Sequence, residues 1–363
     1  MLEDMTIEIL LKLPVKSLLR FKCVCKYWYT LIRSSTFVKK HLHHQSNNAR
    51  LLVHYYNCST LEYSFAFFQD KTLATFPLVY YDVDGVVIPN NPNIFGHYDG
   101  ILGLYDWDSI ALWNPATREF RFLPMPNPDI PPRFSVLEHK FGFGLDHTTN
   151  DYKVVCIRTY YYSEDYEDYH SAVIVLFHLS TNSWRLFEAD LSRVTYVHES
   201  SCSTCLNGVY YWLTSVLDKL EFRTTYFYNK ILTFDLSNEV FGDIPGPQDI
   251  PKLNLGNLIL YDESISVMCF DQREVEKYVD IWVMKEEGCW IKELTIGPLV
   301  DVGKALGFWK NGELFLETIT LKLVLYNPNT QEIKDLQHDG PYDMRKIFVY
   351  TESLVSIKEG NEC

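Results

Sequence analysis

Cysteine side chains in this 363-residue chain are the first candidates for metal or redox chemistry. Cys23 and Cys25 lie two positions apart in a strongly helical stretch, so they would point about 200° apart and could not converge on one metal ion. Cys202 and Cys205 form an isolated CxxC pair, with neither a second ligand pair nor a βαβ context nearby. We therefore expect Cys23 and Cys25 to serve packing, and the CxxC pair to be structural or incidental.

Histidines and carboxylates are the next candidates. The run HLHH at 41–44 lies where two regions of the chain meet, and helix-end histidines on a surface explain it better than a metal site. Four carboxylates crowd among the tyrosines of 160–170, whereas glycoside hydrolysis needs two carboxylates in fixed geometry. FGFGLD lacks the spacing and the following helix of a phosphate-binding loop, and no GxSxG or HExxH motif occurs. We predict no catalytic residue, no metal and no cofactor.

The composition indicates a globular and acidic chain. Hydrophobic residues make up 47% and charged residues 22%, which excludes a disordered chain. The formal net charge of −14 argues against nucleic acid and favours a basic protein partner. No apolar run approaches the roughly 20 residues of a membrane span, and MLEDMTIEIL lacks the positive charge of a signal peptide. We expect a cytoplasmic protein that can also be present in the nucleus. Its cysteines should be reduced.

In the first 45 residues, apolar side chains recur with the spacing of α-helices. Asp4 is the expected N-cap of a first helix, and Pro14 should end that helix and open a second one. A third helix is expected to carry residues 27–32, and Ser35 should cap a fourth. Roughly forty residues cannot bury so much apolar surface alone, so a partner or the rest of the chain must cover it.

After residue 45 apolar and polar residues alternate with a period of two, which is typical of strands. One turn pattern also recurs in this region. Each copy has an apolar pair, a turn that Asp or Asn opens in most copies, and a bulky residue six positions later. Successive copies are 44, 64, 57, 49 and 43 residues apart, which indicates a β-propeller of about six blades, with five to seven open. The turn anchors are Asp70, Asn114, His178, Asp235, Met284 and Asn327.

A closed propeller pairs its two chain ends within one region, because this protects the edges of the sheets. RLLVHYY at 50–56 and KIFVYTESLVSI at 346–357 are the candidate end strands. We expect them to lie in the same sheet or in adjacent sheets.

The helical segment also resembles a known family. EDMTIEILLKLPVKSLLRFKCVCKYWYTLIRSSTFVKKHL is similar to the F-box of plant F-box proteins in its Leu-Pro pair, its KSLLRFKCVCK.W core and its LI.S..F run. The family usually opens with Leu-Pro before the acidic pair where this chain has Met1-Leu2, which leaves a natural start further upstream open. The resemblance implies an F-box at 1–45 that binds a Skp-type adaptor and, through it, a cullin. The implied adaptor contacts are Ile9, Leu10, Leu13, Pro14, Leu18, Val24, Cys25, Trp28 and Leu31.

Residues 46–363 resemble the F-box-associated, kelch-like domain of one large plant group. NPATREFRFLP, FGFGLD...NDYKVVCI, LSTNSWRLFE and IWVMKEEGCWIKELTIGPL carry the likeness, and within that group the chain looks most like the S-locus F-box proteins and their S-locus-like relatives. The expected fold class is a small all-α F-box module followed by an all-β propeller. The resemblance implies a non-catalytic receptor subunit of a Skp–cullin–F-box ubiquitin ligase, which in pollen would bind pistil S-ribonucleases in self-incompatibility.

Target binding is expected from loops of the propeller, because loops on a rigid scaffold usually carry binding. The segment 160–170 combines carboxylates with tyrosines, a composition suited to the Lys and Arg side chains of a basic protein such as an S-ribonuclease. Its expected contacts are Tyr160, Tyr161, Tyr162, Glu164, Asp165, Glu167 and Asp168. Two other functions stay open: an F-box paralogue that targets another regulatory protein, and a propeller enzyme or lectin with an N-terminal helical extension.

Overall fold

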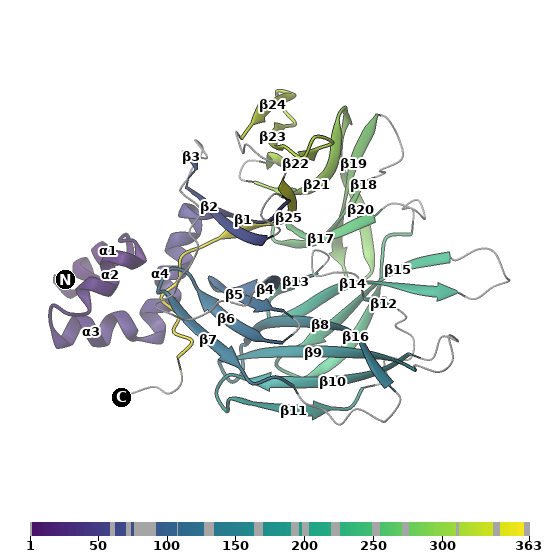
Figure 1. The fold of residues 1–363 in the computed structure, drawn as a ribbon. Helices are drawn as coiled ribbons and strands as arrows, with labels where there is room; N and C mark the ends of the chain where they lie inside the picture. Colours follow the sequence, from purple (N-terminus) through teal and green to yellow (C-terminus); the bar gives the residue numbers. More distant parts are fainter. Residues whose placement is uncertain are drawn as a thin grey trace.

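The chain forms a helical module at one side of a propeller of six sheets (Figure 1). This computed structural model describes residues 2–58, 62–69, 74–75, 92–106, 108–126, 134–162, 170–189, 196–197, 203–218, 226–248, 255–270, 276–309, 312–336 and 342–358. The expected fold class, a small all-α module followed by an all-β propeller with about six blades, is confirmed.

Four helices lie within the described part of the module: α1 (Leu2–Leu11), α2 (Val15–Phe21), α3 (Lys26–Arg33) and α4 (Ser35–Gln45). Pro14 follows the end of α1 and stands at the N-cap of α2. Two expected caps are wrong by a few positions. Asp4 lies inside α1, and the cap of α4 is Ser34, whose Oγ accepts a hydrogen bond of 3.3 Å from the Phe37 amide.

Among the described residues, no helix combines the length and the hydropathy needed to cross a membrane.

A short 3-10 turn, η1 (Ser46–Asn48), leads from the module into the sheets, which are antiparallel. Blade 1 holds β25 (Tyr342–Tyr350), β1 (Arg50–Asn57), β2 (Glu62–Gln69) and β3 (Ala74–Thr75). Blade 2 holds β4 (Asn93–Tyr98), β5 (Ile101–Tyr105), β6 (Ile110–Asn114) and β7 (Glu119–Leu123). Blade 3 holds β8 (Phe134–Asp146), β9 (Asp151–Tyr162), β10 (His170–His178) and β11 (Ser183–Phe187).

The remaining three blades follow in chain order. Blade 4 holds β12 (Tyr196–Val197), β13 (Ser203–Leu206), β14 (Val209–Asp218), β15 (Tyr226–Asp235) and β16 (Val240–Pro245). Blade 5 holds β17 (Leu255–Tyr261), β18 (Ser264–Phe270), β19 (Lys277–Glu286) and β20 (Cys289–Leu299). Blade 6 holds β21 (Val302–Phe308), β22 (Leu314–Thr318), β23 (Leu323–Asn327) and β24 (Glu332–Asp335).

Blade 1 closes the propeller with strands from both ends of the domain. β1 pairs with β25 from Arg50 opposite Tyr350 to Asn57 opposite Tyr342. The expectation that the two end segments share a sheet is therefore confirmed for residues 346–350 of the expected segment 346–357. Beyond Tyr350 the chain leaves the sheet and continues as an irregular segment to residue 358.

The repeated turn pattern has a structural cause. Each anchor in the described blades lies in or beside the turn between the third strand and the outermost strand. The Asp235 carboxylate, for example, accepts hydrogen bonds from the backbone N–H groups of Ser237 and Asn238, at 2.8 and 2.9 Å, so Asp or Asn stabilises the turn. Four positions after the anchors the backbone has positive φ, at Arg118, Asn182, Glu239, Gly288 and Gln331. The remaining anchor, Asp70, lies outside the described residues.

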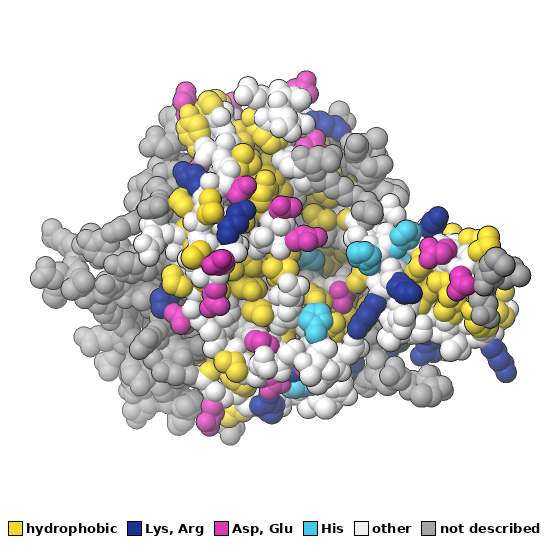
Figure 2. Space-filling model, turned by 180° about the vertical axis from the view of Figure 1, so that it is seen from behind, with side chains coloured by type: hydrophobic (Ala, Val, Ile, Leu, Met, Phe, Trp, Pro, Cys, Tyr) yellow, Lys and Arg dark blue, Asp and Glu magenta, His cyan; other side chains and the backbone are white. Residues whose placement is uncertain are grey.

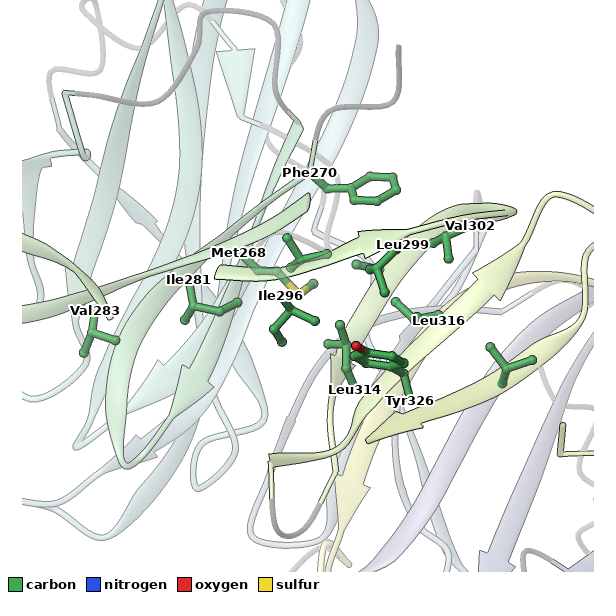
Figure 3. Close-up of a cluster of buried hydrophobic side chains, with 13 residues drawn as sticks. Met268, Phe270, Ile281, Val283, Ile296, Leu299, Val302, Leu314, Leu316 and Tyr326 are labelled. Atoms are coloured by element: carbon green, nitrogen blue, oxygen red, sulfur yellow. The ribbon is translucent and has the colours of Figure 1, made fainter. Parts of the chain in front are cut away.

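Apolar side chains of neighbouring blades fill the space between the sheets. Figure 3 shows this between blades 5 and 6, where Ile281 and Ile296 lie near Leu314 and Tyr326, all of them buried in one cluster. Such burial supplies the main favourable term in folding, about 25 cal/mol per Å² of apolar surface. Each blade therefore depends on its neighbours for its core.

The glycines of FGFGLD let blade 3 approach blade 4 closely. A Cβ at Gly142 would lie 2.6 Å from the Trp212 ring, and a Cβ at Gly144 would lie 2.7 Å from the Cys205 sulfur. Trp212 also donates a hydrogen bond of 3.1 Å from Nε1 to the Phe141 carbonyl oxygen. These glycines are needed for packing between blades, in agreement with the interpretation that the motif does not hold phosphate.

Candidate functional site

The helical module has a small core of its own, which fixes what the module can present to a partner. The fully or nearly buried members come from all four helices and are Leu10, Leu11, Val15, Leu18, Ile32 and Phe37. Leu354, from the segment after β25, completes the same cluster. The C-terminal part of the chain therefore covers apolar surface that the module cannot bury alone.

Several large apolar side chains of the module remain outside this core. Met5 and Ile9 are each 61% exposed and lie four positions apart, on one face of α1. Val24 is 62% exposed in the turn between α2 and α3, and Tyr27 at the start of α3 is also exposed. We call these four side chains the outer apolar surface. Figure 2 shows hydrophobic side chains gathered at the outer end of the module. Apolar side chains that gather on an exposed face commonly mark a protein-binding surface.

The nine expected adaptor contacts divide by exposure into three groups. Ile9, Pro14, Val24 and Cys25 are exposed, Leu13, Trp28 and Leu31 are half-buried, and Leu10 and Leu18 are buried. The last two are corrections, because side chains that are 1% and 0% exposed cannot touch a partner. They act through the helices that they hold together.

The two cysteines of the CxC pair also differ from expectation. Both are exposed, and Cys25 is the N-cap of α3 with extended backbone, so the pair spans a helix boundary and does not lie within one helix. The packing role expected for Cys23 and Cys25 is therefore wrong. Cys205 is buried, whereas Cys202 lies outside the described residues. Within the described ranges, no group of three His, Cys, Asp or Glu side chains is arranged to hold a metal ion.

Two polar residues of α4 position the Leu13-Pro14 turn. A ring nitrogen of His41, Nε2, lies 2.9 Å from the Leu13 carbonyl oxygen, and the Gln45 amide donates a hydrogen bond of 3.2 Å to the Leu11 carbonyl oxygen. Both side chains are buried, so the expectation of a surface histidine is wrong at position 41. Burial lowers the pKa of His41, which favours the neutral ring. The spacing of Phe37, His41 and Gln45 by four residues was the sequence signal that all three share the inner face of α4.

The segment after β25, residues 351–358, ties the module to blade 2, and we call it the C-terminal strap. Asn114 Nδ2 donates hydrogen bonds to the Ser353 and Val355 carbonyl oxygens, at 3.1 and 2.7 Å. The Ile357 amide donates a bond of 2.9 Å to Glu119 Oε2. Since Leu354 enters the module core between these anchors, one strap holds both parts. The sequence did not predict this role, because apolar and polar residues alternate in the strap as they do in a strand.

Charge is distributed very unevenly between the two parts. Residues 1–45 contain eight Lys or Arg and three Asp or Glu, a net of +5. Since the whole chain has a net charge of −14, residues 46–363 carry −19. The module therefore favours an acidic partner and the propeller a basic one.

The expected target-binding segment leaves blade 3 at the end away from the module. The β8–β9 and β10–β11 turns of this blade face the module, because Asn150 and Ser180 line a cleft together with residues of α4. Antiparallel β9 and β10 therefore have Tyr162 and His170 at their far ends (Figure 1). Glu164, Asp165, Glu167 and Asp168 lie outside the described residues, as do the side chains of Tyr161 and Tyr162. Tyr160 is a correction: it is 1% exposed and cannot contact a target.

Comparison with known proteins assigns both parts. Residues 3–40 match the F-box domain, and residues 86–357 match the F-box associated beta propeller domain. The F-box/kelch-repeat protein At3g23880 of Arabidopsis thaliana is 27% identical over 97% of this chain and 94% of its own length. The F-box protein CPR1 of the same plant is 27% identical over 98% of this chain and 89% of its own length. The chain therefore belongs to the family of F-box proteins that carry an F-box-associated β-propeller domain.

Proposed function

We propose that this chain is the substrate-recognition subunit of a Skp–cullin–F-box ubiquitin ligase, with an F-box at 1–45 and a target-binding propeller at 46–363. The observation that carries the proposal is an F-box whose outer apolar surface stays uncovered by the propeller. A Skp-type adaptor would cover Ile9, Pro14, Val24 and Cys25, with Leu13, Trp28 and Leu31 at the edge of the contact. The adaptor would connect the chain to a cullin.

The mechanism would be proximity. The propeller would hold a target protein so that one of its lysines reaches the ubiquitin-conjugating enzyme at high effective concentration. The chain itself would supply no catalytic residue, metal or cofactor. Adaptor and target would bind at opposite ends of the molecule, since the β9 and β10 ends that carry residues 163–169 point away from the module.

For the target we propose a basic protein, and within this class a pistil S-ribonuclease bound in the cytoplasm of a pollen tube. The net charge of −19 on residues 46–363 supports a basic target. The likeness to S-locus F-box proteins supports the ribonuclease. An F-box paralogue with another regulatory target is the alternative, and expression confined to pollen would favour the S-locus assignment over it.

Adaptor binding is tested by placing charge on the outer apolar surface. Ile9→Asp and Val24→Asp should each abolish pull-down of a Skp-type adaptor, because an unpaired carboxylate would be buried in the contact. Ile319→Asp is the matched control, since Ile319 is 63% exposed on the propeller against 61% for Ile9. The change at Ile319 should leave pull-down intact. Undiminished pull-down by both F-box variants would contradict the proposal.

A further inference from the structure

A cleft of about 800 Å³ lies between the module and the propeller. One wall comes from α3, α4 and the end of α2, and the other from the turns of blades 2 and 3. Strap residues complete the lining. Small-molecule sites are commonly clefts of about 300–1,000 Å³ at domain interfaces. The cleft is therefore large enough for a small ligand that would touch both parts of the protein.

The helical wall of the cleft is rich in cations. Lys22, Arg33 and Lys39 line it, and Lys358 of the strap joins them. Within the described residues, the ammonium groups of Lys22 and Lys39 make no hydrogen bond or ion pair, unlike Lys153 in the propeller. Burial lowers the pKa of Lys22, against an opposing effect of Glu119, because its ammonium has lost water without gaining a close partner. An anion in the cleft would provide that partner.

The propeller wall carries the carboxylates of Asp99, Glu119 and Asp151. Its cation, Arg121, already donates hydrogen bonds to the carbonyl oxygens of Ile357 and Leu179 and to the Asn182 side chain. Asp99 accepts a hydrogen bond of 2.8 Å from the Tyr152 hydroxyl. Asp151 accepts bonds from the Ser180 amide and hydroxyl, at 2.9 and 2.7 Å. A carboxylate has about four acceptor positions, so these bonds leave capacity for further donors. The two walls therefore differ in what they would accept from a ligand.

We propose that this cleft binds a small organic anion, with its phosphate or carboxylate at Lys22 and Lys39 and its hydroxyl or amine donors at Asp99 and Asp151. The ammonium groups on the helical wall and the carboxylates on the propeller wall select a molecule that carries both acceptor and donor groups. Apolar side chains of the lining, Leu145 and Leu179 among them, would exclude water and strengthen both contacts. A bound molecule would join the module to the propeller, whichever partner the F-box takes.

Calorimetric titration of the full chain tests the proposal with four probes. Glucose 6-phosphate and gluconate carry hydroxyls with a phosphate or a carboxylate, and saturable binding of at least one is expected and identifies the preferred anion. Glucose, without a charge, should not bind. Inorganic phosphate, with far fewer donors, should bind at least tenfold more weakly. Lys22→Met and Lys39→Met should each weaken binding about tenfold, the effect of losing one charge-assisted hydrogen bond.

Two further variants separate the site from general charge effects. Lys16→Met is the control, because Lys16 is an exposed cation of α2 that does not line the cleft, and it should leave binding unchanged. Asp99→Asn should weaken the hydroxylated anion but not inorganic phosphate. The proposal is overturned if neither hydroxylated anion binds, if inorganic phosphate binds as tightly, or if Lys16→Met weakens binding as much as Lys22→Met does.

Discussion

The side-chain amide of Asn114 donates a hydrogen bond of 2.7 Å to the carbonyl oxygen of Val355, 241 positions further along the chain. Asn114 is one of the repeated turn anchors, and its Oδ1 also accepts bonds from the amides of Ala116 and Thr117, at 3.0 and 3.3 Å. One side chain therefore stabilises its own turn and fixes the C-terminal strap, which in turn supports the F-box.

Leu354→Ala should loosen the F-box without opening the propeller. Leu354 is buried among the apolar side chains of the module, and truncation of a buried leucine costs about 2–5 kcal/mol. Hydrogen exchange should become faster in α1 and α4, whereas β18 and β19 in blade 5 should keep their protection. Ser356→Ala, at an exposed strap position, is the control. Equal protection of α1 and α4 in both variants would show that the strap does not support the module.

Lys153→Met should strongly reduce the free energy of unfolding. Lys153 Nζ lies 2.8 Å from both Asp146 Oδ2 and Glu239 Oε1, and it joins blades 3 and 4. Lys153 and Asp146 are 3% and 1% exposed, so removal of the cation leaves a buried carboxylate without its partner and costs about 3–5 kcal/mol.

The matched control for this change is Lys230→Met. Lys230 lies 2.6 Å from Asp243, but this pair is 34% and 60% exposed and should contribute at most about 1 kcal/mol. Urea denaturation of the two variants measures the difference. A loss at Lys153 no larger than that at Lys230 would mean that the buried pair contributes little.

Stability should fall as the pH is lowered from about 6.5 towards 4. Burial lowers the pKa of His97 and of His139 to about 4, and a nearby cation acts in the same direction, Lys346 for His97 and Arg158 for His139. A histidine with a lowered folded pKa takes up its proton more readily in the unfolded chain, so acid favours unfolding in this window. The urea midpoint should decrease from pH 7 to pH 5, and His139→Gln should make that decrease smaller. An unchanged slope in this variant would exclude a contribution from His139.

Capture of a basic target should depend on the acidic segment of residues 163–169. Glu164, Asp165, Glu167 and Asp168 changed together to amides should slow association and affect dissociation less, because exposed charges mainly steer the encounter. The effect should shrink at high salt, where charges are screened beyond about 3 Å at 1 M. Stopped-flow binding at two salt concentrations measures this. An association rate equal to wild type at low salt would remove this segment from target capture.

The sequence determined the change from helices to strands and indicated about six repeats, because these depend on local periodicity and turn chemistry. Apolar residues recur with helical spacing before residue 45 and with a period of two after it, and this change separates the module from the propeller. The anchors mark their turns because an Asp or Asn side chain bonds backbone groups only two or three residues away. The F-box resemblance is of the same kind, since it depends on spacings within about forty residues.

Only the tertiary structure decided which of these residues are available to a partner. Ile9 and Leu10 are neighbours in sequence with similar chemistry, yet one is 61% exposed and the other 1%, because α1 packs only one face against the module core. The strap residue Leu354 reaches that core from the far end of the chain, and Lys153 meets Glu239 across two blades. Local spacing can show which residues share a face, but which face is covered, and by which partner, depends on segments that are distant in sequence.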